Sequence, residues 1–371
     1  RFMRYPKDIG FSILNIRRGL FCWLECQTEP HEGPTQLQTI QGDKPHATAQ
    51  IHPGHLRRRR SDHARRSTCA RRVRSFPPKT IKFVVPFGPG SGTDTSARYF
   101  ARKLQDLTGQ AVVVENKPGA NGFIAVKQVL TAPADGYTVF IGSNSTLAVN
   151  AALFKELPYD PAKDFAPLTM MMRSPAMLTV TPQAPYQDLK GLLAYAKANP
   201  GKVNFGAGSA GYQLMGELLN DAAKVQTVHV PFKGAGETMT AVASGTVDYA
   251  FAEVTAVQEL AKGGRVKVLA VAADKRVDSS PDVPTASEAG LPGFEAYTWV
   301  GALVSSKTPA AGTAKLGERF TAISKMDETR AFYERIGATP MTGGPAQMQE
   351  FQKNEIALWK RIVTQAKVPQ Q

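Results

Sequence analysis

Short apolar stretches alternate with longer segments of helical spacing from Pro77 to the end of the chain, and this alternation limits the fold more than any other feature. The apolar runs at residues 81–85 and 112–115 have the length and β-branched content of buried strands. A helix lies between them, with Thr93 or Asp94 as its expected N-cap and Gly109 at its end. Short strands separated by helices predict an α/β fold with parallel sheets covered on both faces.

The same pattern continues through the rest of the chain. We expect further strands at residues 137–141, 177–180, 203–205, 228–230, 249–251 and 268–272. We expect further helices at residues 123–130, 189–198, 213–223, 237–244 and 257–261, with a mostly helical part from residue 310 onward. About 295 residues of this kind fit two sheets better than one, so the sequence predicts two α/β lobes.

Positive charge is concentrated before the folded part begins. Residues 1–78 carry 15 Lys and Arg against 6 Asp and Glu, whereas the remaining 293 residues carry 30 against 25. One interpretation of the basic segment is an arm that binds nucleic acid or a membrane surface. We favour the other, a disordered or non-native basic leader over residues 1–75, because no aromatic residues are interleaved with the arginines to stack on bases. We predict no nucleic-acid partner.

Cysteine and histidine are nearly absent from the folded part. All three cysteines and five of the six histidines precede Phe76, and the remaining histidine is His229. A cysteine nucleophile, a thiolate zinc site or a two-histidine metal site therefore cannot form there. We predict neither a metal site nor a cofactor.

Four glycine-rich loops follow predicted strands, and three of them lead directly into helices. They span residues 88–94, 119–122, 206–211 and 233–236. In α/β sheets, ligands collect beyond the carboxyl ends of the strands, and a helix N-terminus offers unpaired N–H groups to an anion. No lysine follows Gly92, as a nucleotide phosphate loop would require. The loops therefore predict a site for a small carboxylate, held by main-chain N–H groups and hydroxyls.

A serine hydrolase is the alternative function. Residues 207–211 (Ala-Gly-Ser-Ala-Gly) resemble a nucleophile elbow around Ser209, between a strand and a helix. The base would be His229, which lies in an apolar strand, and the acids between the two are Glu217 and Asp221, both in the helix after the elbow. This arrangement is weak, so a binding protein is the favoured prediction over an enzyme.

Several motifs, taken in order, resemble the tripartite tricarboxylate transporter receptor family, also called the Bug extracytoplasmic solute receptors. They are residues 81–90 (IKFVVPFGPG), 114–120 (VENKPGA), 135–138 (DGYT), 228–234 (VHVPFKG), 281–285 (PDVPT) and 288–293 (EAGLPG). The resemblance spans residues 77–366. It implies a type II periplasmic-binding-protein fold, in which a hinge joins two α/β lobes and the ligand cleft lies between them.

The resemblance also implies where the lobes divide and what they serve. Residues 76–172 and 300–371 would form lobe one and residues 173–299 lobe two, with hinge crossings near residues 170–174 and 297–301. The protein would be a periplasmic monomer without enzymatic activity that delivers a dicarboxylate, an aromatic acid or an amino acid to membrane permease subunits. A signal peptide is not recognisable, since the apolar run at residues 19–24 is too short for one.

The family's binding positions correspond to loops from both lobes of this chain. The ligand-binding residues implied by the resemblance are Phe87, Gly90, Ser91, Gly92, Thr93 and Asp94 in the first loop, Gly208, Ser209 and Ala210 in the second lobe, and Asn121, Ser143, Asn144, Lys233 and Gly234 along the cleft. Glu253 falls where the family varies its chemistry, so we expect it to influence specificity. The chain departs from the family at Gly90-Ser91, which is often a pair of glycines, and in the shorter loop at Ser209, which lacks the usual histidine.

Overall fold

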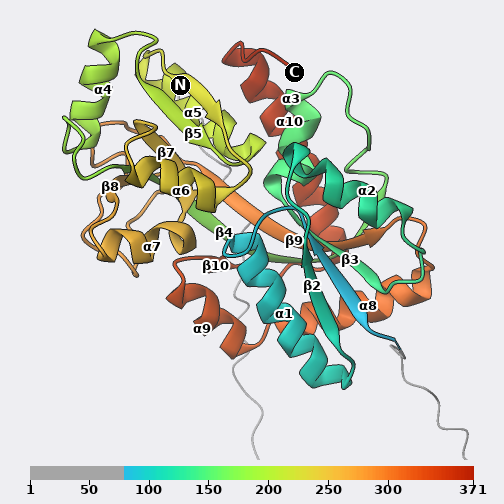
Figure 1. Ribbon diagram of the computed structural model, residues 1–371. Coiled ribbons are helices and arrows are strands. Elements are labelled where there is room, and N and C mark those ends of the chain that lie inside the picture. Colours follow the sequence, from blue (N-terminus) through green and yellow to red (C-terminus); the bar gives the residue numbers. More distant parts are fainter. Residues whose placement is uncertain (1–78) are drawn as a thin grey trace, which may run out of the picture. The chain divides into compact units, whose positions relative to one another are not determined.

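The computed structural model describes residues 79–371 (Figure 1). The interpretation of residues 1–75 as a leader lies outside the described residues. The described part consists of helices packed around mixed β-sheet in two groups of strands, here called the first and second lobes.

The first lobe contains the start and the end of the described chain. Strand β1 pairs in parallel with β2 and β3, and β9 adds to β3 in the antiparallel direction. Its strands are β1 (Ile81–Val85), β2 (Val112–Asn116), β3 (Thr138–Ser143) and β9 (Tyr297–Ser305), with the two-residue β10 (Thr339–Pro340) beside β4 (Phe165–Val180). Its helices are α1 (Gly92–Thr108), α2 (Phe123–Thr131), α3 (Asn150–Leu153), α8 (Ala310–Ser324), α9 (Asp327–Arg335) and α10 (Pro345–Gln365), with short turns η1 (Ala120–Gly122) and η2 (Ser145–Val149).

The second lobe is formed by the middle of the chain. Strand β5 pairs in parallel with β6 and β7, while β8 lies along β4 in the antiparallel direction. The strands are β5 (Asn204–Ala207), β6 (Val228–Pro231), β7 (Tyr249–Glu253) and β8 (Lys267–Val271). The helices are α4 (Leu189–Ala198), α5 (Ala210–Ala223), α6 (Ala235–Ala243) and α7 (Val254–Lys262).

Strand β4 (Phe165–Val180) belongs to both lobes. Its first part, to Pro175, pairs with β9, and its last part, from Ala176, pairs with β7 and β8. In Figure 1, β4 and β9 run between the helices of the two lobes. The prediction of a strand at residues 177–180 was therefore too short, and β9 was missed. The expected parallel pairing is present among β1, β2 and β3 and among β5, β6 and β7, but β4, β8, β9 and β10 pair in the antiparallel direction, so the sheet is mixed.

Apolar side chains on β1 show how the first sheet is covered on both faces. Successive side chains in a strand point to opposite faces. Ile81, Phe83 and Val85 pack in one core cluster with residues of α1 and α8, whereas Val84 packs in another with residues of α2 and α10. All four are fully buried. The apolar run that predicted this strand is thus explained by helices on both sides.

Helix α1 begins earlier than the sequence predicted. Ser91, in extended backbone conformation, is the N-cap, and its hydroxyl accepts a hydrogen bond from the N–H of Asp94. The expectation of Thr93 or Asp94 as the N-cap was wrong, because the Asp94 carboxylate is used elsewhere in the loop. Gly109 is confirmed as the C-cap, with a left-handed φ of 68°. Among the helices that the structure describes, none has the length and apolar character to cross a membrane.

Candidate ligand-binding site

A cavity lies where the strand ends of the two lobes face each other. Its free volume is about 30 Å³. A buried water needs about 10–15 Å³ on the same measure, so the cavity as it stands has room for about two waters. Its walls come from the loop after β1, the end of β3, α5, the end of β7, and strands β4 and β9. They are lined by Phe87, Ser91, Gly92, Thr93, Ser143, Asn144, Ser145, Met172, Gly208, Ser209, Tyr212, Ala235, Glu253, Thr298 and Val300.

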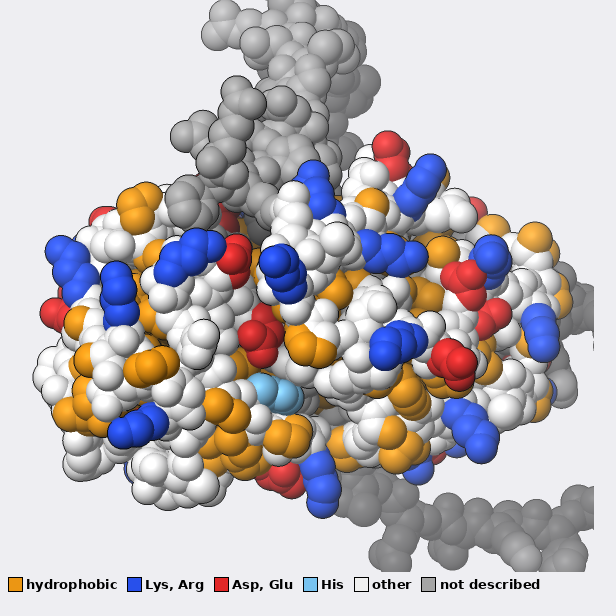
Figure 2. All heavy atoms as spheres, turned by 90° about the horizontal axis from the view of Figure 1, so that it is seen from above, with side chains coloured by type: hydrophobic (Ala, Val, Ile, Leu, Met, Phe, Trp, Pro, Cys, Tyr) orange, Lys and Arg blue, Asp and Glu red, His pale blue; other side chains and the backbone are white. Residues whose placement is uncertain are grey.

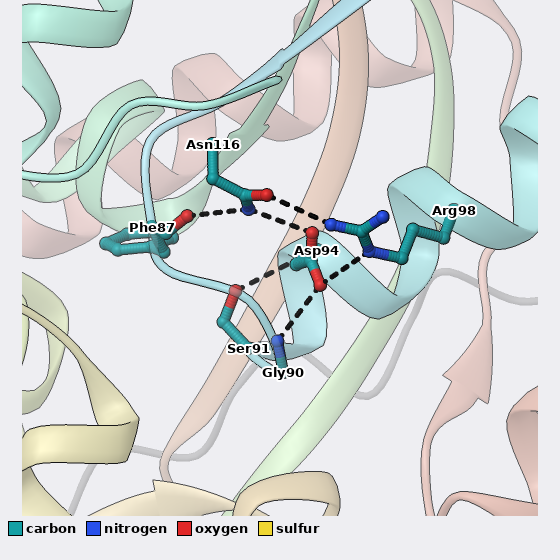
Figure 3. Close-up of polar contacts among 6 residues, drawn as sticks. All are labelled: Phe87, Gly90, Ser91, Asp94, Arg98 and Asn116. Atoms are coloured by element: carbon teal, nitrogen blue, oxygen red, sulfur yellow. Dashed lines mark hydrogen bonds and ion pairs between the residues drawn. The ribbon is translucent and has the colours of Figure 1, made fainter. Parts of the chain in front are cut away.

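The loop between β1 and α1 is held in place by Asp94. One carboxylate oxygen accepts from the Gly90 N–H at 2.9 Å and from Arg98 Nε at 3.0 Å, and the other accepts from Asn116 Nδ2 at 2.8 Å. Asn116 also donates to the carbonyl of Phe87 at 2.9 Å (Figure 3). Because Asp94 is 3% exposed and its hydrogen bonds face the loop, it shapes the cavity wall from behind.

The N-terminus of α1 meets a carboxylate from the second lobe. The Gly92 N–H donates to Oε1 of Glu253 at 2.7 Å, and both groups are buried. Glu253 ends β7, and burial raises the pKa of its carboxyl group. Its other oxygen, Oε2, is buried without a hydrogen-bond partner. A carboxyl oxygen of the second lobe therefore already occupies the helix N-terminus that the sequence assigned to a ligand carboxylate.

The N-terminus of α5, a helix of the second lobe, is capped by a side chain of the first lobe. Ser145 in η2 accepts a hydrogen bond from the Gly211 N–H at 3.1 Å and donates to the Ser209 hydroxyl at 3.1 Å. The structure therefore places an oxygen of the opposite lobe at each of the two helix N-termini. These contacts hold the lobes together across the cavity.

Glycine is required where the lobes approach most closely. A Cβ on Gly92 would lie 3.2 Å from Oε1 of Glu253, and a Cβ on Gly211 would lie 2.8 Å from Oγ of Ser145. A Cβ on Gly208 would lie only 2.4 Å from the backbone of Gly234, within the second lobe. These three glycines thus allow close packing without a left-handed backbone, whereas Gly90 in the first loop does have a positive φ of 84°.

Four buried polar atoms that line the cavity have no hydrogen-bond partner. They are Oγ of Ser143, Nδ2 of Asn144, the hydroxyl of Tyr212 and Oε2 of Glu253. Buried polar groups are almost always paired, so several unpaired ones among the residues that line one cavity are typical of a site that awaits a polar ligand. The lining residues that the structure describes include no lysine, arginine or histidine. The arrangement can bind an anion through neutral donors and a donor group through Glu253.

Most of the predicted site residues line this cavity, and the others lie near it. Those in the lining are Phe87, Ser91, Gly92, Thr93, Ser143, Asn144, Gly208, Ser209 and Glu253. Outside the lining are Gly90 and Asp94, which order the first loop, and Ala210, which is buried in the core. Also outside are Asn121, whose carbonyl accepts from Asn150, exposed Lys233, and Gly234, which packs against Gly208.

The sequence prediction did not include several residues of the cavity wall. They are Ser145, Met172, Tyr212, Ala235, Thr298 and Val300. Ser145 and Ala235 adjoin predicted loops, and a wider margin around those loops would have included them. Met172, Thr298 and Val300 lie in β4 and β9, the two strands whose extent was not predicted, and Tyr212 lies in the first turn of α5.

The geometry gives no support to a serine hydrolase. The hydroxyl of Ser209 contacts the hydroxyl of Ser145. The imidazole of His229 packs instead against the ring of Phe205, with ring centroids 5.3 Å apart. Burial lowers the pKa of His229, and its Nε2 has no partner. Ser209 and His229 therefore do not form a nucleophile–base pair.

Surface charge does not single out a macromolecular partner. On the face seen in Figure 2, lysine and arginine side chains are scattered and interleaved with acidic ones. This agrees with the nearly balanced charge of the last 293 residues. The face drawn there has no basic patch of the kind that binds nucleic acid.

Solved structures of other proteins share the fold of this chain. R. palustris Rpa4515 with adipate has a TM-score of 0.76 at 33% identity, covering 79% of this chain and 98% of that one. MatC from Rhodopseudomonas palustris with bound malate has a TM-score of 0.73 at 33% identity, covering 78% and 100%. The periplasmic binding protein BugD has a TM-score of 0.75 at 29% identity, covering 80% and 100%. Two α/β lobes around a shared cavity therefore define this molecule as a solute-binding protein of the periplasmic-binding-protein fold.

Sequence comparisons give the family. The model for the tripartite tricarboxylate transporter family receptor matches residues 96–368. A UPF0065 protein in the tcbD-tcbE intergenic region of Pseudomonas sp. (strain P51) is 34% identical over 303 residues, 81% of this chain and 90% of that protein. BugT of Bordetella pertussis is 32% identical over 292 residues, 78% and 90%. The chain belongs to the tripartite tricarboxylate transporter receptor family, a family of solute receptors rather than enzymes, which confirms the resemblance seen in the motifs.

Proposed function

We propose that the protein captures a small carboxylated metabolite in the cavity between its lobes and presents it to the membrane permease subunits of a tripartite transporter. The observation that carries this proposal is the set of four unpaired, buried polar atoms contributed by both lobes to the residues that line one cavity. Adipate and malate in the related R. palustris structures support a carboxylate as the ligand class. The protein acts in the periplasm, as a monomer, and does not transform its ligand.

The ligand carboxylate is held by neutral donors. The amide Nδ2 of Asn144 and the hydroxyls of Ser143 and Tyr212 are available, and all three residues are buried. The dipoles of α1 and α5 add a favourable potential at their N-termini, while the N–H groups of Gly92 and Gly211 are already paired across the lobes. Asp94 and Gly90 do not contact the ligand in this proposal. Their hydrogen bond fixes the loop between β1 and α1 that forms part of the cavity wall.

Ligand entry requires the lobes to separate. The free volume of about 30 Å³ holds about two waters and is too small for a dicarboxylate of malate or adipate size. We place the moving parts at residues 76–172 with 300–371 for lobe one and residues 173–299 for lobe two. The two crossings lie near residues 170–174 and 297–301, where β4 and β9 pass between the lobes. A hinge motion there opens and closes the cavity.

A thermal-shift screen tests the proposed function. Because a ligand that binds only the folded state stabilises it, a carboxylate at a hundredfold excess over its Kd adds about 2.7 kcal/mol. We expect one or more members of a panel of dicarboxylates, aromatic acids and amino acids to raise the Tm by several degrees, with one-to-one binding by calorimetry. Native mass spectrometry first checks that no co-purified ligand fills the site. An empty protein that responds to no carboxylate contradicts the proposal.

A further inference from the structure

We propose that Glu253 selects carboxylates that also carry an ammonium group, so that this receptor prefers amino carboxylates to dicarboxylates of the same length. The proposal rests on the function proposed above and names the ligand class of the same site. Glu253 is 6% exposed, lines the cavity and comes from the second lobe. Only one of its two oxygens is paired across the lobes.

The hydrogen-bond partners of Glu253 leave one acceptor unused. Oε1 accepts from the N–H of Gly92 at 2.7 Å, and none of the ion pairs between residues 79 and 371 includes Glu253. Asp94, the other buried acid of this loop, differs in this respect because it is paired with Arg98 and Asn116. A buried carboxylate oxygen without a partner is costly, and a donor group on the ligand removes that cost.

Charge in the cavity distinguishes the ligand classes. Among the described lining residues, Glu253 is the one acidic side chain and there is no basic one. A second carboxylate on the ligand would bring two like charges together in a buried site, where their repulsion is poorly screened. An ammonium group forms a charge-assisted hydrogen bond with Oε2 instead. The neutral donors Ser143 and Asn144, from the first lobe, remain for the ligand carboxylate.

Matched ligand series test the preference. Each series keeps the chain length and changes only the far group: γ-aminobutyrate, succinate and butyrate; δ-aminovalerate, glutarate and valerate; ε-aminocaproate, adipate and caproate. The α-amino acids α-aminobutyrate, norvaline and norleucine move the ammonium next to the carboxylate. With the wild-type protein and calorimetry, we expect at least one amino carboxylate to bind ten times more tightly than the dicarboxylate or the simple acid of its length.

The substitution Glu253→Gln tests the residue itself. Glutamine keeps the size and an acceptor for the Gly92 N–H but removes the charge, so the preference for the ammonium ligand should fall at least tenfold. Glu259→Gln is the matched control, because Glu259 is exposed in α7 and pairs with Lys262. It should leave the preference unchanged. Glu253→Asp keeps the charge, so it should still bind amino carboxylates more tightly than dicarboxylates. This variant tests the proposal if Glu253→Gln does not fold.

The outcomes separate this proposal from the proposed function. If dicarboxylates bind as tightly as amino carboxylates to the wild-type protein, or if Glu253→Gln folds and keeps the preference, the role of Glu253 is wrong while the carboxylate receptor stands. If none of the ligands in these series or in the wider carboxylate panel binds the empty protein, the proposed function fails, and this inference fails with it.

Discussion

At the scale of single residues, the two buried acids beside the first loop have different roles. Both carboxylate oxygens of Asp94 are paired, with donors from Gly90, Arg98 and Asn116, and these hydrogen bonds tie the loop to α1 and β2. Glu253 has one partner and an unused oxygen. A paired carboxylate supports structure, whereas an unpaired one facing a cavity is available to a ligand.

Asp94→Asn should weaken both the fold and the site. Asparagine has a single side-chain oxygen, so it cannot accept from both Gly90 and Asn116, and one buried donor loses its charged partner. Hydrogen bonds to charged groups contribute about 1.5–3 kcal/mol, so we expect the free energy of unfolding to fall by about 2 kcal/mol. Urea unfolding measures it, with the exposed Asp106→Asn on the same helix as control. Equal stability of the two variants would show that Asp94 does not hold the loop.

At the scale of elements, helix α10 docks on the first lobe around a buried acid. Oε2 of Glu355 accepts from the indole N–H of Trp299 in β9 at 2.8 Å and from that of Trp359 in α10 at 3.2 Å. Gln352, one turn earlier, donates to the carbonyls of Leu147 and Pro161. Figure 1 shows α10 beside α3, and the two helices are in contact. The C-terminal helix is therefore joined to the lobe by buried polar contacts as well as apolar ones.

Glu355→Gln should change how stability depends on pH. Burial raises the pKa of Glu355 above its ordinary value of 4.5. As pH rises above that value the unfolded chain loses the proton first, so the wild type loses stability until the folded-state pKa is passed. Glutamine keeps an acceptor for both indoles without the charge. We expect the variant to be more stable than wild type near pH 8 and the difference to shrink toward pH 4.5.

Urea unfolding at a series of pH values measures this difference. The matched control is Glu350→Gln, because Glu350 is an exposed acid of the same helix. Its stability curve should run parallel to that of the wild type. A Glu355→Gln variant that follows the wild-type curve at every pH would rule out a buried titration at this helix.

Elements with a clear local pattern could be predicted from the sequence, and the shared strands could not. β1 and α4 were predicted with the bounds that the structure has. β4 was predicted only over its last residues because Pro167 and Pro175 interrupt it, and proline within a run argues against a strand. For the site, the rule that ligands collect at strand ends located both helix N-termini. It could not show that Glu253 and Ser145 reach across, because those contacts depend on how the lobes pack.

At the scale of the whole molecule, the two lobes meet at glycines, and a side chain of each lobe caps a helix N-terminus of the other. The Gly92–Glu253 and Gly211–Ser145 contacts form only when the cavity is nearly closed. Their number is small, so a ligand that bridges the lobes can shift the balance between open and closed forms. If the lobes close on a ligand as proposed, we expect the affinity to depend on how closely Gly211 approaches the first lobe.

Gly211→Ala should lower ligand affinity without lowering stability. The new Cβ would lie 2.8 Å from Oγ of Ser145 and 3.0 Å from Nδ2 of Asn144, both in the opposite lobe, so closure is obstructed. Alanine favours the helix by up to about 1 kcal/mol, so the Tm of the free protein should not fall. We expect the Kd for the best carboxylate to rise at least tenfold, about 1.4 kcal/mol.

Gly236→Ala is the matched control for this experiment. Gly236 also lies in the first turn of a helix, and a Cβ there would meet no atom within 4 Å. Calorimetry should give the wild-type Kd for this variant. Unchanged affinity in Gly211→Ala would mean that the productive complex does not bring the lobes as close as they are in this structure.

The sharing of β4 between the lobes has a consequence for synthesis. This sixteen-residue, mostly buried strand ends at Val180, but its partners β7, β8 and β9 begin only at Tyr249, Lys267 and Tyr297. A chain still on the ribosome therefore carries an apolar segment whose neighbours do not yet exist. Pairing over such sequence separations is slow, and an unpaired strand invites aggregation. Until β9 has been made, we therefore expect β4 to be an aggregation-prone segment of the unfinished chain.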